Sequence, residues 1–272
     1  MNQFQNRVVL VTGASRGVGA TTAKLFAEQG ANVCVNYFQS KDKAEKIVSE
    51  IQSNKGNAFS FQADVTNYSQ VQSMISAIQE KYGKLDFIVN NALPKYEFNP
   101  NANYVSIETI HWDNFNTQFT GIIGGVINTT KASLPLFKKQ KFGKIINIST
   151  NLVYNPVVTY YDYTTAKSAL IGLTRSMAVE LGKYGIRVNL IAGGLLSVTD
   201  ASSSTTKEVF DYIANVTPLR TVTTVENFAN SILLFASPWS DSITGQSISV
   251  DGGLTRPYRT VDISFILIFL FE

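Results

Sequence analysis

Short apolar runs alternate with longer amphipathic stretches along the first part of the chain. The short runs are rich in β-branched and aromatic residues and end in glycine or polar residues, which is typical of buried strands. They are RVVLVT, ANVCVNYF, FSFQ, LDFIVN and KIINIS. Between them, stretches such as ATTAKLFAEQ and KDKAEKIVSEIQ carry apolar residues at helical spacing and predict helices. Strands that alternate with helices indicate a parallel sheet, which binds ligands at the carboxyl ends of its strands.

The composition is that of a globular protein, and the length is compatible with one domain. Hydrophobic residues make up 44% of the 272 residues, and the formal net charge of +3 is too weak to favour a nucleic-acid partner. Cys34 is the only cysteine, so an internal disulfide is excluded and a reducing compartment is indicated. The single His111 excludes a multi-histidine metal site, and the single cysteine excludes a thiolate cluster. The N-terminus MNQFQNR has no apolar signal core, and we expect a cytoplasmic protein.

The end of the chain differs from the rest. We expect one cofactor-binding domain over residues 1–257 and an apolar tail over residues 258–272. The apolar run of the tail, Ile263 to Phe271, has nine residues, about half of the roughly 20 that a membrane-spanning helix needs. No membrane anchor is expected. The tail either packs on a neighbouring subunit or is an extension of unknown role.

A glycine-rich turn follows the first predicted strand. The sequence TGASRGVG lies between that strand and the start of a helix, where free backbone amides and the helix dipole favour an anion. We therefore expect a cofactor phosphate here rather than only a tight turn. The residues expected to bind it are Gly13, Ser15, Arg16, Gly17 and Val18.

The end of the second strand bears on the choice between NAD and NADP. A carboxylate at this place binds a ribose 2′-OH and repels a 2′-phosphate, and the chain has no acid here before Asp42. Donors and positive charge stand there instead, at Arg16, Asn36, Tyr37, Ser40 and Lys41. NADP(H) is therefore the expected cofactor, although Lys41 also begins a stretch that is typical of a solvated helix.

Two further strand ends are expected to contact the cofactor. Asp64 can accept a hydrogen bond from the adenine amino group, while Val65 packs on the adenine ring. Asn91 and Ala92 follow the next strand, where the cofactor ribose would lie.

The stretch from Thr150 to Lys167 carries the candidate chemistry. Tyr163 and Lys167 share one face if the segment is helical, and a nearby ammonium lowers the pKa of a phenol towards neutral pH. Thr150 ends the KIINIS run and can place its hydroxyl beside the phenol, which makes two donors for a carbonyl oxygen. A tyrosine and a lysine at this spacing are also common as a surface pair, so the spacing by itself does not establish catalysis.

Five motifs in order resemble the short-chain dehydrogenase/reductase family over residues 6–254. They are TGASRGVG, ADV, NNA, YTTAK and TGQSISVDGGL. The resemblance implies a single-domain α/β fold of Rossmann type, with a doubly wound parallel seven-stranded sheet and helices on both faces. It also implies a nicotinamide cofactor and hydride transfer to or from a carbonyl or alcohol. The run from Thr150 to Lys167 is most similar to that of 3-oxoacyl-[acyl-carrier-protein] reductases, through TNL, NPVV, DYT and AK.

The resemblance assigns catalytic roles to three residues. Tyr163 matches the family's proton donor, and Lys167 matches its partner, which also holds the nicotinamide ribose. The family's serine falls on Thr150 and not on Ser149, which keeps the hydroxyl and adds a methyl group.

One position departs from the family. The helix asparagine that supports a proton-relay water falls on Ile122, which cannot bind water. Either a group one turn earlier replaces it, at Asn116 or Gln118, or proton return is slower.

The resemblance also covers the segment after the YTTAK helix. The family's Pro-Gly falls on Gly193 and Gly194, which indicates a more flexible loop. Gly194 and Thr199 are expected at the cofactor, and the polar segment from Leu195 to Thr217 suits a mobile lid. In the family the YTTAK helix packs against its mate, so a homodimer or homotetramer is expected.

These residues favour an NADPH-dependent reductase of a 3-oxoacyl thioester, with Tyr163 as the proton donor. A basic cluster then offers a docking surface for an acidic acyl-carrier protein, with Lys141 where the family's bacterial reductases present a docking arginine; such clusters are also common as solvated faces. The cluster is Lys138, Lys139, Lys141 and Lys144. Two alternatives stay open: an NADP-dependent reductase or dehydrogenase of a free ketone, alcohol or sugar, and a non-catalytic cofactor-binding protein of the same fold.

Overall fold

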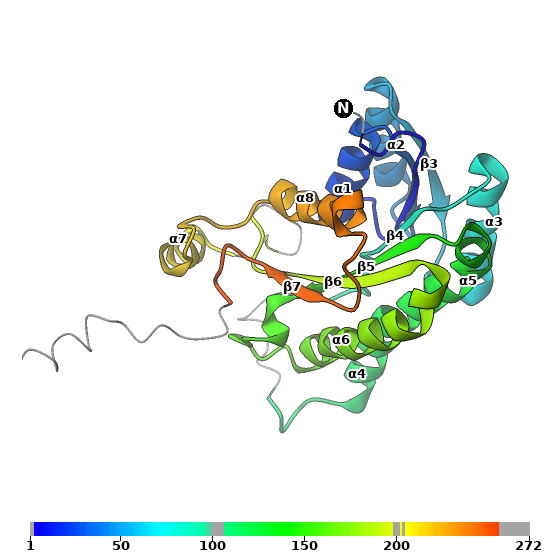
Figure 1. Cartoon of the computed structure of the whole chain (residues 1–272). Coiled ribbons are helices and arrows are strands. Elements are labelled where there is room, and N and C mark those ends of the chain that lie inside the picture. Colours follow the sequence, from blue (N-terminus) through cyan, green and yellow to red (C-terminus); the bar gives the residue numbers. More distant parts are fainter. Residues whose placement is uncertain (1–2, 97, 99–105, 198–201, 203–204, 256–272) are drawn as a thin grey trace, which may run out of the picture.

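The computed structural model describes residues 3–96, 98, 106–197, 202 and 205–255. Within them, parallel strands form one seven-stranded sheet in the order β3-β2-β1-β4-β5-β6-β7 (Figure 1). The strands are β1 (Val8–Val11), β2 (Asn32–Tyr37), β3 (Asn57–Gln62), β4 (Phe87–Asn90), β5 (Gly143–Thr150), β6 (Ile186–Gly193) and β7 (Ser247–Val250). The chain runs outward from β1 to β3 and returns to β4 beside β1, so the strand order reverses between β1 and β4. The doubly wound sheet expected from the sequence is confirmed.

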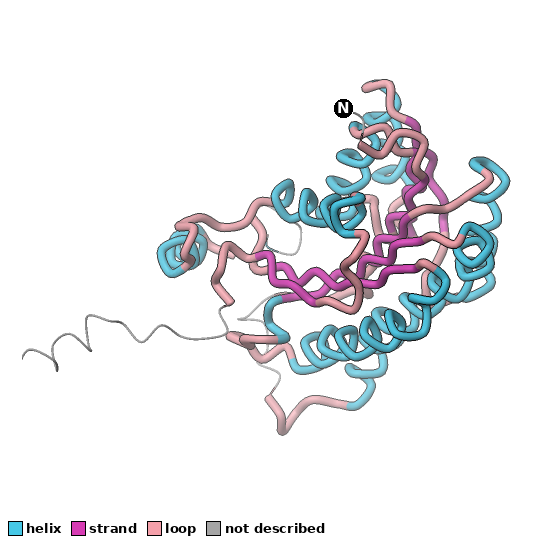
Figure 2. The backbone as a smooth tube through the Cα atoms, viewed as in Figure 1, coloured by secondary structure: helices cyan, strands magenta, loops and turns pink. Residues whose placement is uncertain are grey.

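Helices cover both faces of the sheet (Figure 2). The α-helices are α1 (Gly17–Glu28), α2 (Lys41–Ser53), α3 (Tyr68–Tyr82), α4 (Trp112–Phe119), α5 (Gly125–Gln140), α6 (Tyr161–Leu181), α7 (Lys207–Val216) and α8 (Val225–Ala236). A π-helical turn, η1 (Thr120–Gly124), joins α4 to α5, and the 3-10 turns are η2 (Asn151–Val153), η3 (Gly182–Tyr184) and η5 (Pro238–Ser240). No helix in the described part of the chain is long and apolar enough to cross a bilayer.

Two hydrophobic cores flank the sheet because successive side chains of a strand point to opposite faces. Val9 and Val11 of β1 lie in one core with Phe26 of α1 and apolar residues of α8. Val8 of β1 and Cys34 of β2 lie in the other core, with apolar residues of α3, α5 and α6. Both faces of the central strands are therefore buried, which explains their continuous apolar runs.

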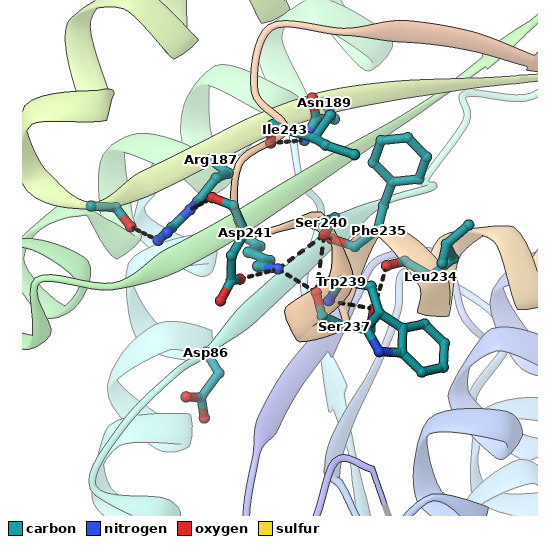
Figure 3. Close-up of polar contacts among 12 residues, drawn as sticks. Asp86, Arg187, Asn189, Leu234, Phe235, Ser237, Trp239, Ser240, Asp241 and Ile243 are labelled. Carbon is teal, nitrogen blue, oxygen red and sulfur yellow. Dashed lines mark hydrogen bonds and ion pairs between the residues drawn. The ribbon is translucent and has the colours of Figure 1, made fainter.

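A buried charge lies near the amino end of β5. Lys144 is 2% exposed, and its Nζ donates to Ser237 O (2.6 Å) and Ser240 Oγ (2.9 Å) and pairs with Asp241 Oδ1 (2.7 Å). Figure 3 shows these three partners, from the segment that follows α8, gathered around one point. Burial lowers the pKa of Lys144, and the bond to Asp241 opposes that shift. The expectation that Lys144 belongs to an exposed basic cluster is wrong, whereas the other members are exposed: Lys138, Lys139 and Lys141.

Replacing Lys144 with Met should destabilise the protein, because the segment after α8 loses its attachment to β5. We expect the free energy of unfolding to fall by roughly 1–3 kcal/mol, the usual cost of leaving buried acceptors without a donor. Urea unfolding followed by circular dichroism measures this. Lys139→Met, an exposed lysine on α5, is the matched control and should change little. Equal unfolding midpoints for the two variants would contradict a structural role for Lys144.

Candidate active site

The glycine turn after β1 lies against the end of β4. A Cβ added to Gly13 would lie 2.9 Å from Ala92 Cα, and one added to Gly19 would lie 2.6 Å from Asn91 Nδ2. Neither distance leaves room for a side chain. Gly13 also has a φ of +60°, which glycine adopts without strain. Gly13 and Gly19 of TGASRGVG are therefore required by the close approach of the two chain segments.

Thr12 and Asn91 fasten this contact. The Thr12 hydroxyl accepts from the backbone N–H of Asn91 (2.9 Å) and of Ala92 (3.0 Å). The Asn91 amide donates in return to Thr12 O (2.9 Å) and Gly13 O (3.1 Å). Sequence reasoning did not single out Thr12, although its place directly before the first glycine of the motif was the available signal.

The start of α1 suits a phosphate. Among the described residues, α1 has no side-chain capping bond at Arg16 and no acidic residue in its first turn. The first backbone N–H groups of a helix lack intrahelical acceptors, so they are available to an anion. A Cβ added to Gly17 would meet nothing within 4 Å, so the space beside the turn is open. The residues of the turn therefore fit the phosphates of a dinucleotide, with Ser15 and Val18 half-buried beside them.

The Asn36 amide is turned inward. Its Oδ1 accepts from Gly13 N (3.2 Å), and its Nδ2 donates to Ala63 O (3.0 Å) and Tyr37 O (3.3 Å). Tyr37 is itself buried in the first core. The structure thus corrects the expectation for these two residues, because Asn36 holds the glycine turn and Tyr37 packs beneath it. Ser40 and Lys41, at the start of α2, remain on the surface near the end of β2.

Asp64 and Val65 follow the carboxyl end of β3. Asp64 Oδ1 accepts from the Thr66 N–H (2.9 Å) and hydroxyl (2.8 Å), which fixes the carboxylate. Val65 contacts α5, since a Cβ added to Gly125 would lie 2.9 Å from Val65 Cγ2. Their contact with adenine stays a prediction.

Thr150, Tyr163 and Lys167 come together at the carboxyl end of β5. All three side chains are buried, and the phenol is only 8% exposed. The Thr150 hydroxyl accepts from the Leu152 N–H (3.3 Å) and lies near enough to the Tyr163 phenol to lower its pKa. Lys167 Nζ lies 5.9 Å from the centre of the Tyr163 ring and donates to Ile148 O (2.7 Å). Ser149 instead donates to Lys167 O (3.2 Å), so its hydroxyl is used within the fold. The geometry agrees with the choice of Thr150 over Ser149.

Hydrogen bonds among buried polar side chains connect β5 and α6, which carry Thr150, Tyr163 and Lys167, to their neighbours. Asn90 Nδ2 donates to Asn147 Oδ1 (2.9 Å), and Asn147 Nδ2 donates to Thr174 Oγ1 (2.9 Å). Thr129 Oγ1 donates to Asn90 Oδ1 (2.7 Å). These bonds join β4, β5, α5 and α6 into one unit, since buried amides that are satisfied fix the relative positions of their elements.

Comparisons with known proteins agree with this geometry. A family model described as enoyl-(acyl carrier protein) reductase matches residues 13–255. A 3-oxoacyl-[acyl-carrier-protein] reductase, FabG, of Staphylococcus aureus is 36% identical over 248 residues, which cover 90% of this chain and 96% of the relative. The structure of a short-chain type dehydrogenase/reductase from Mycobacterium ulcerans has a TM-score of 0.85 at 27% identity and covers 99% of this chain and 96% of its own. The chain belongs to the short-chain dehydrogenase/reductase family.

Two further relatives show the range of the family. A 3-oxoacyl-[acyl-carrier-protein] reductase of Synechocystis is 34% identical over 257 residues, 93% of this chain and 99% of the relative. A gluconate 5-dehydrogenase of Burkholderia cenocepacia, in complex with NADP and tartrate, has a TM-score of 0.83 at 27% identity, and covers 93% of this chain and 97% of its own. This short-chain dehydrogenase/reductase is an oxidoreductase acting on CH–OH or C=O groups, with a nicotinamide cofactor.

Burial, and not mutual attraction, dominates the pKa values of Tyr163 and Lys167. It raises the pKa of Tyr163 well above its usual value, while the neighbouring Thr150 hydroxyl acts in the opposite direction. It lowers the pKa of Lys167 to about 8. The expectation that Lys167 lowers the pKa of the phenol is therefore wrong for the protein alone, because both groups are driven towards their neutral forms.

The burial of residues in α4 and η1 shows which of the two candidate replacements for the family asparagine can bind a water molecule. Ile122 lies in the π-helical turn η1 and is buried in the same core as Tyr163. Asn116 is exposed on α4. Gln118 is 2% exposed, and its Oε1 has no hydrogen-bond partner among the described atoms. A buried amide oxygen without a donor is the group that can take a water molecule here.

The segment after β6 is packed rather than open. A Cβ added to Gly193 would lie 2.8 Å from Phe228 Cε2, and one added to Gly194 would lie 2.8 Å from Asp251 Cβ. The absence of proline beside Gly194 had indicated a more flexible loop. The structure shows instead that Gly193 and Gly194 permit close packing against Phe228 and Asp251. Thr199 lies outside the described residues, as do parts of the expected lid and the tail over residues 258–272.

Replacing Lys167 with Met should stabilise the protein alone at neutral pH, by an amount that shrinks as the pH rises. The folded pKa of Lys167 is about 8 and its ordinary value is 10.5, so below about pH 8 the folded protein bears the full cost of a buried ammonium. Between these values the unfolded chain binds more protons, and wild-type stability rises relative to the variant. We expect a difference on the order of 2 kcal/mol at pH 7, after subtraction of the lost bond to Ile148.

Urea unfolding of wild type and Lys167→Met at several values between about pH 7 and about pH 10 measures this difference. Lys183→Met, at an exposed lysine that follows α6, corrects for the general effect of removing a lysine. A difference that stays constant across this pH range would contradict the lowered pKa of Lys167.

Proposed function

We propose that this short-chain dehydrogenase/reductase reduces 3-oxoacyl thioesters with NADPH. The observation that carries the proposal is the buried set of Thr150, Tyr163 and Lys167 at the end of β5, facing the same sheet edge as the glycine turn. The full-length similarity to 3-oxoacyl-[acyl-carrier-protein] reductases supports the choice of substrate.

The side chains of the site perform three tasks in this reaction. The bound cofactor supplies the hydride that reaches the carbonyl carbon. Thr150 and Tyr163 donate hydrogen bonds to the carbonyl oxygen and so stabilise the negative charge that develops on it. Tyr163 then gives up its proton to that oxygen as the negative charge develops, and the raised pKa of its buried phenol keeps it protonated until then. Lys167, held by Ile148 O, lies beside the phenol and would hold the nicotinamide ribose of the bound cofactor.

NADPH is proposed over NADH on the charges near the end of β2. The first carboxylate after β2 is Asp42, in the first turn of α2, and it is preceded by Ser40 and Lys41, while Arg16 lies in the glycine turn. A ribose 2′-phosphate would therefore meet donors and positive charge rather than an acid. Asn36 and Tyr37 take no part in this preference, because they face inward.

An acidic acyl-carrier protein is the proposed partner of the remaining basic cluster. Lys138, Lys139 and Lys141 are exposed at the end of α5, where their positive charges attract an acidic surface. A homodimer or homotetramer through α6 stays a prediction, and Val179 of that helix is an exposed apolar residue of the kind that an interface covers.

A second candidate is the reduction or oxidation of a free ketone, alcohol or sugar. The structural similarity to a gluconate 5-dehydrogenase favours it, at lower sequence identity than the 3-oxoacyl reductases.

Activity with NADPH and NADH on 3-oxoacyl thioesters, simple ketones and sugars tests the proposal. We expect the highest kcat/KM on a 3-oxoacyl thioester with NADPH, and a loss of about 100-fold or more in kcat for Tyr163→Phe with unchanged NADPH affinity. Tyr161→Phe, at a neighbouring tyrosine of α6, is the matched control. Turnover of ketones or sugars without turnover of thioesters would replace the substrate, and full activity of Tyr163→Phe would refute the mechanism.

Gln118→Leu tests whether the buried amide replaces the family asparagine. We propose that Gln118 holds the water that returns a proton to the site, so the variant should lose about tenfold in kcat at unchanged KM. Asn116→Leu on the same helix should change neither quantity.

Adding Ile122→Asn to Gln118→Leu should restore most of the lost kcat if proton return is the step affected. An unaltered kcat in Gln118→Leu would show that this amide has no role in the reaction.

A further inference from the structure

The catalytic phenol belongs to a cluster of four aromatic rings, those of Tyr96, Phe98, Tyr160 and Tyr163. The ring of Tyr96 lies 5.1 Å from that of Tyr163 at an interplanar angle of 30°, and the ring of Phe98 lies 5.2 Å from it, edge-on at 90°. Tyr160 contacts both of them, at 5.6 Å from Tyr96 and 5.9 Å from Phe98. Tyr96 and Phe98 follow β4 in the sequence, whereas Tyr160 and Tyr163 lie at the start of α6. The cluster therefore closes the space between these two segments with aromatic surface.

Tyr96 is fixed at its hydroxyl as well as at its ring. The hydroxyl donates to Asp162 Oδ1 (3.1 Å), and Asp162 is a buried carboxylate in the first turn of α6. Burial and the negative charge of Asp162 both raise the pKa of Tyr96, so its phenol stays a neutral donor. A hydrogen bond to a carboxylate is stronger than one between neutral groups, so Asp162 orients the ring.

This arrangement limits what can reach the catalytic phenol. Tyr163 is nearly buried, and Tyr96 and Phe98 are the rings in contact with it from the β4 side. A substrate must bring its carbonyl to the Tyr163 hydroxyl and place the groups beside that carbonyl against these rings. Apolar groups gain from this contact, whereas the hydroxyls of a polyol would lose water without finding partners.

We propose that Tyr96 is the specificity-determining residue of this site, with Asp162 as its positioning residue, and that it selects substrates with a short apolar acyl group beside the carbonyl. The inference deepens the proposed function and rests on it. It assigns the discrimination between 3-oxoacyl thioesters and sugars to one ring in the segment after β4.

Selectivity measurements on Tyr96 variants test the assignment. The substrates are the 3-oxobutanoyl and 3-oxooctanoyl thioesters of N-acetylcysteamine and 5-ketogluconate, all with NADPH. Tyr96→Ala should lower the preference for 3-oxobutanoyl thioester over 5-ketogluconate by about tenfold and raise the relative kcat/KM on the longer chain by a similar factor. Tyr96→Phe keeps the ring, so the preference should stay within about threefold while KM rises, since the bond to Asp162 is lost.

Tyr154→Ala is the matched control, because Tyr154 is exposed and follows η2 near the same end of the sheet. It should leave all three kcat/KM values unchanged. Equal affinity for NADPH in wild type and all variants confirms that each is folded, since the cofactor residues do not include Tyr96. An unchanged substrate preference in Tyr96→Ala would overturn the inference.

A chemical probe gives a readout that needs no turnover. Nitration by tetranitromethane, followed by peptide mass spectrometry, reports how accessible each tyrosine is. Tyr163 should react at least about fivefold faster in Tyr96→Ala than in wild type, with Tyr154 as the internal reference. If wild type reduces none of the substrates and Tyr163 still becomes reactive, the proposed function fails and the position of Tyr96 stands. If wild type is active and neither selectivity nor nitration changes in Tyr96→Ala, the inference about Tyr96 fails.

Discussion

The close contact between the glycine turn and the end of β4 is the constraint on which the site depends. Gly13 and Gly19 have no room for a Cβ, and the Thr12 hydroxyl receives two backbone N–H groups from the far segment. This contact lies where the strand order reverses, between β1 and β4, so it sets the floor of the crevice in which an open α/β sheet binds its ligand. The inward amide of Asn36 adds β2 to the same junction, through Gly13 N.

The catalytic side is coupled to this junction through two consecutive asparagines. Asn91, which follows β4, donates to the glycine turn, whereas Asn90, the last residue of β4, donates to Asn147 of β5. Asn147 continues to Thr174 of α6, the helix that carries Tyr163 and Lys167. A short chain of buried amides thus holds the cofactor half and the catalytic half in one register. The two consecutive asparagines therefore bind both the glycine turn, through Asn91, and β5, through Asn90.

Much of this could be predicted from the sequence, because the signals were local. Apolar runs marked the strands, and the spacing of Tyr163 and Lys167 placed them on one face of a helix, although it did not predict that both are buried. What could not be predicted depends on where a side chain turns in three dimensions. Lys144 reads as one more lysine of a basic cluster, yet it reaches partners after α8. Tyr96 carries no local signal either, since its contacts with Asp162 and Tyr163 join segments that are distant in sequence.

Burial sets the protonation of the two ionisable side chains beside Thr150. It raises the pKa of the Tyr163 phenol, and it lowers that of Lys167 to about 8. A phenol with a raised pKa keeps its proton at neutral pH, so in the free protein Tyr163 is a neutral hydrogen-bond donor. The rings of Tyr96 and Phe98 lie against this phenol, and the apolar surface that they add disfavours a phenolate. The packing of the segment after β4 against α6 therefore contributes to the protonation state of Tyr163 as well as to the core.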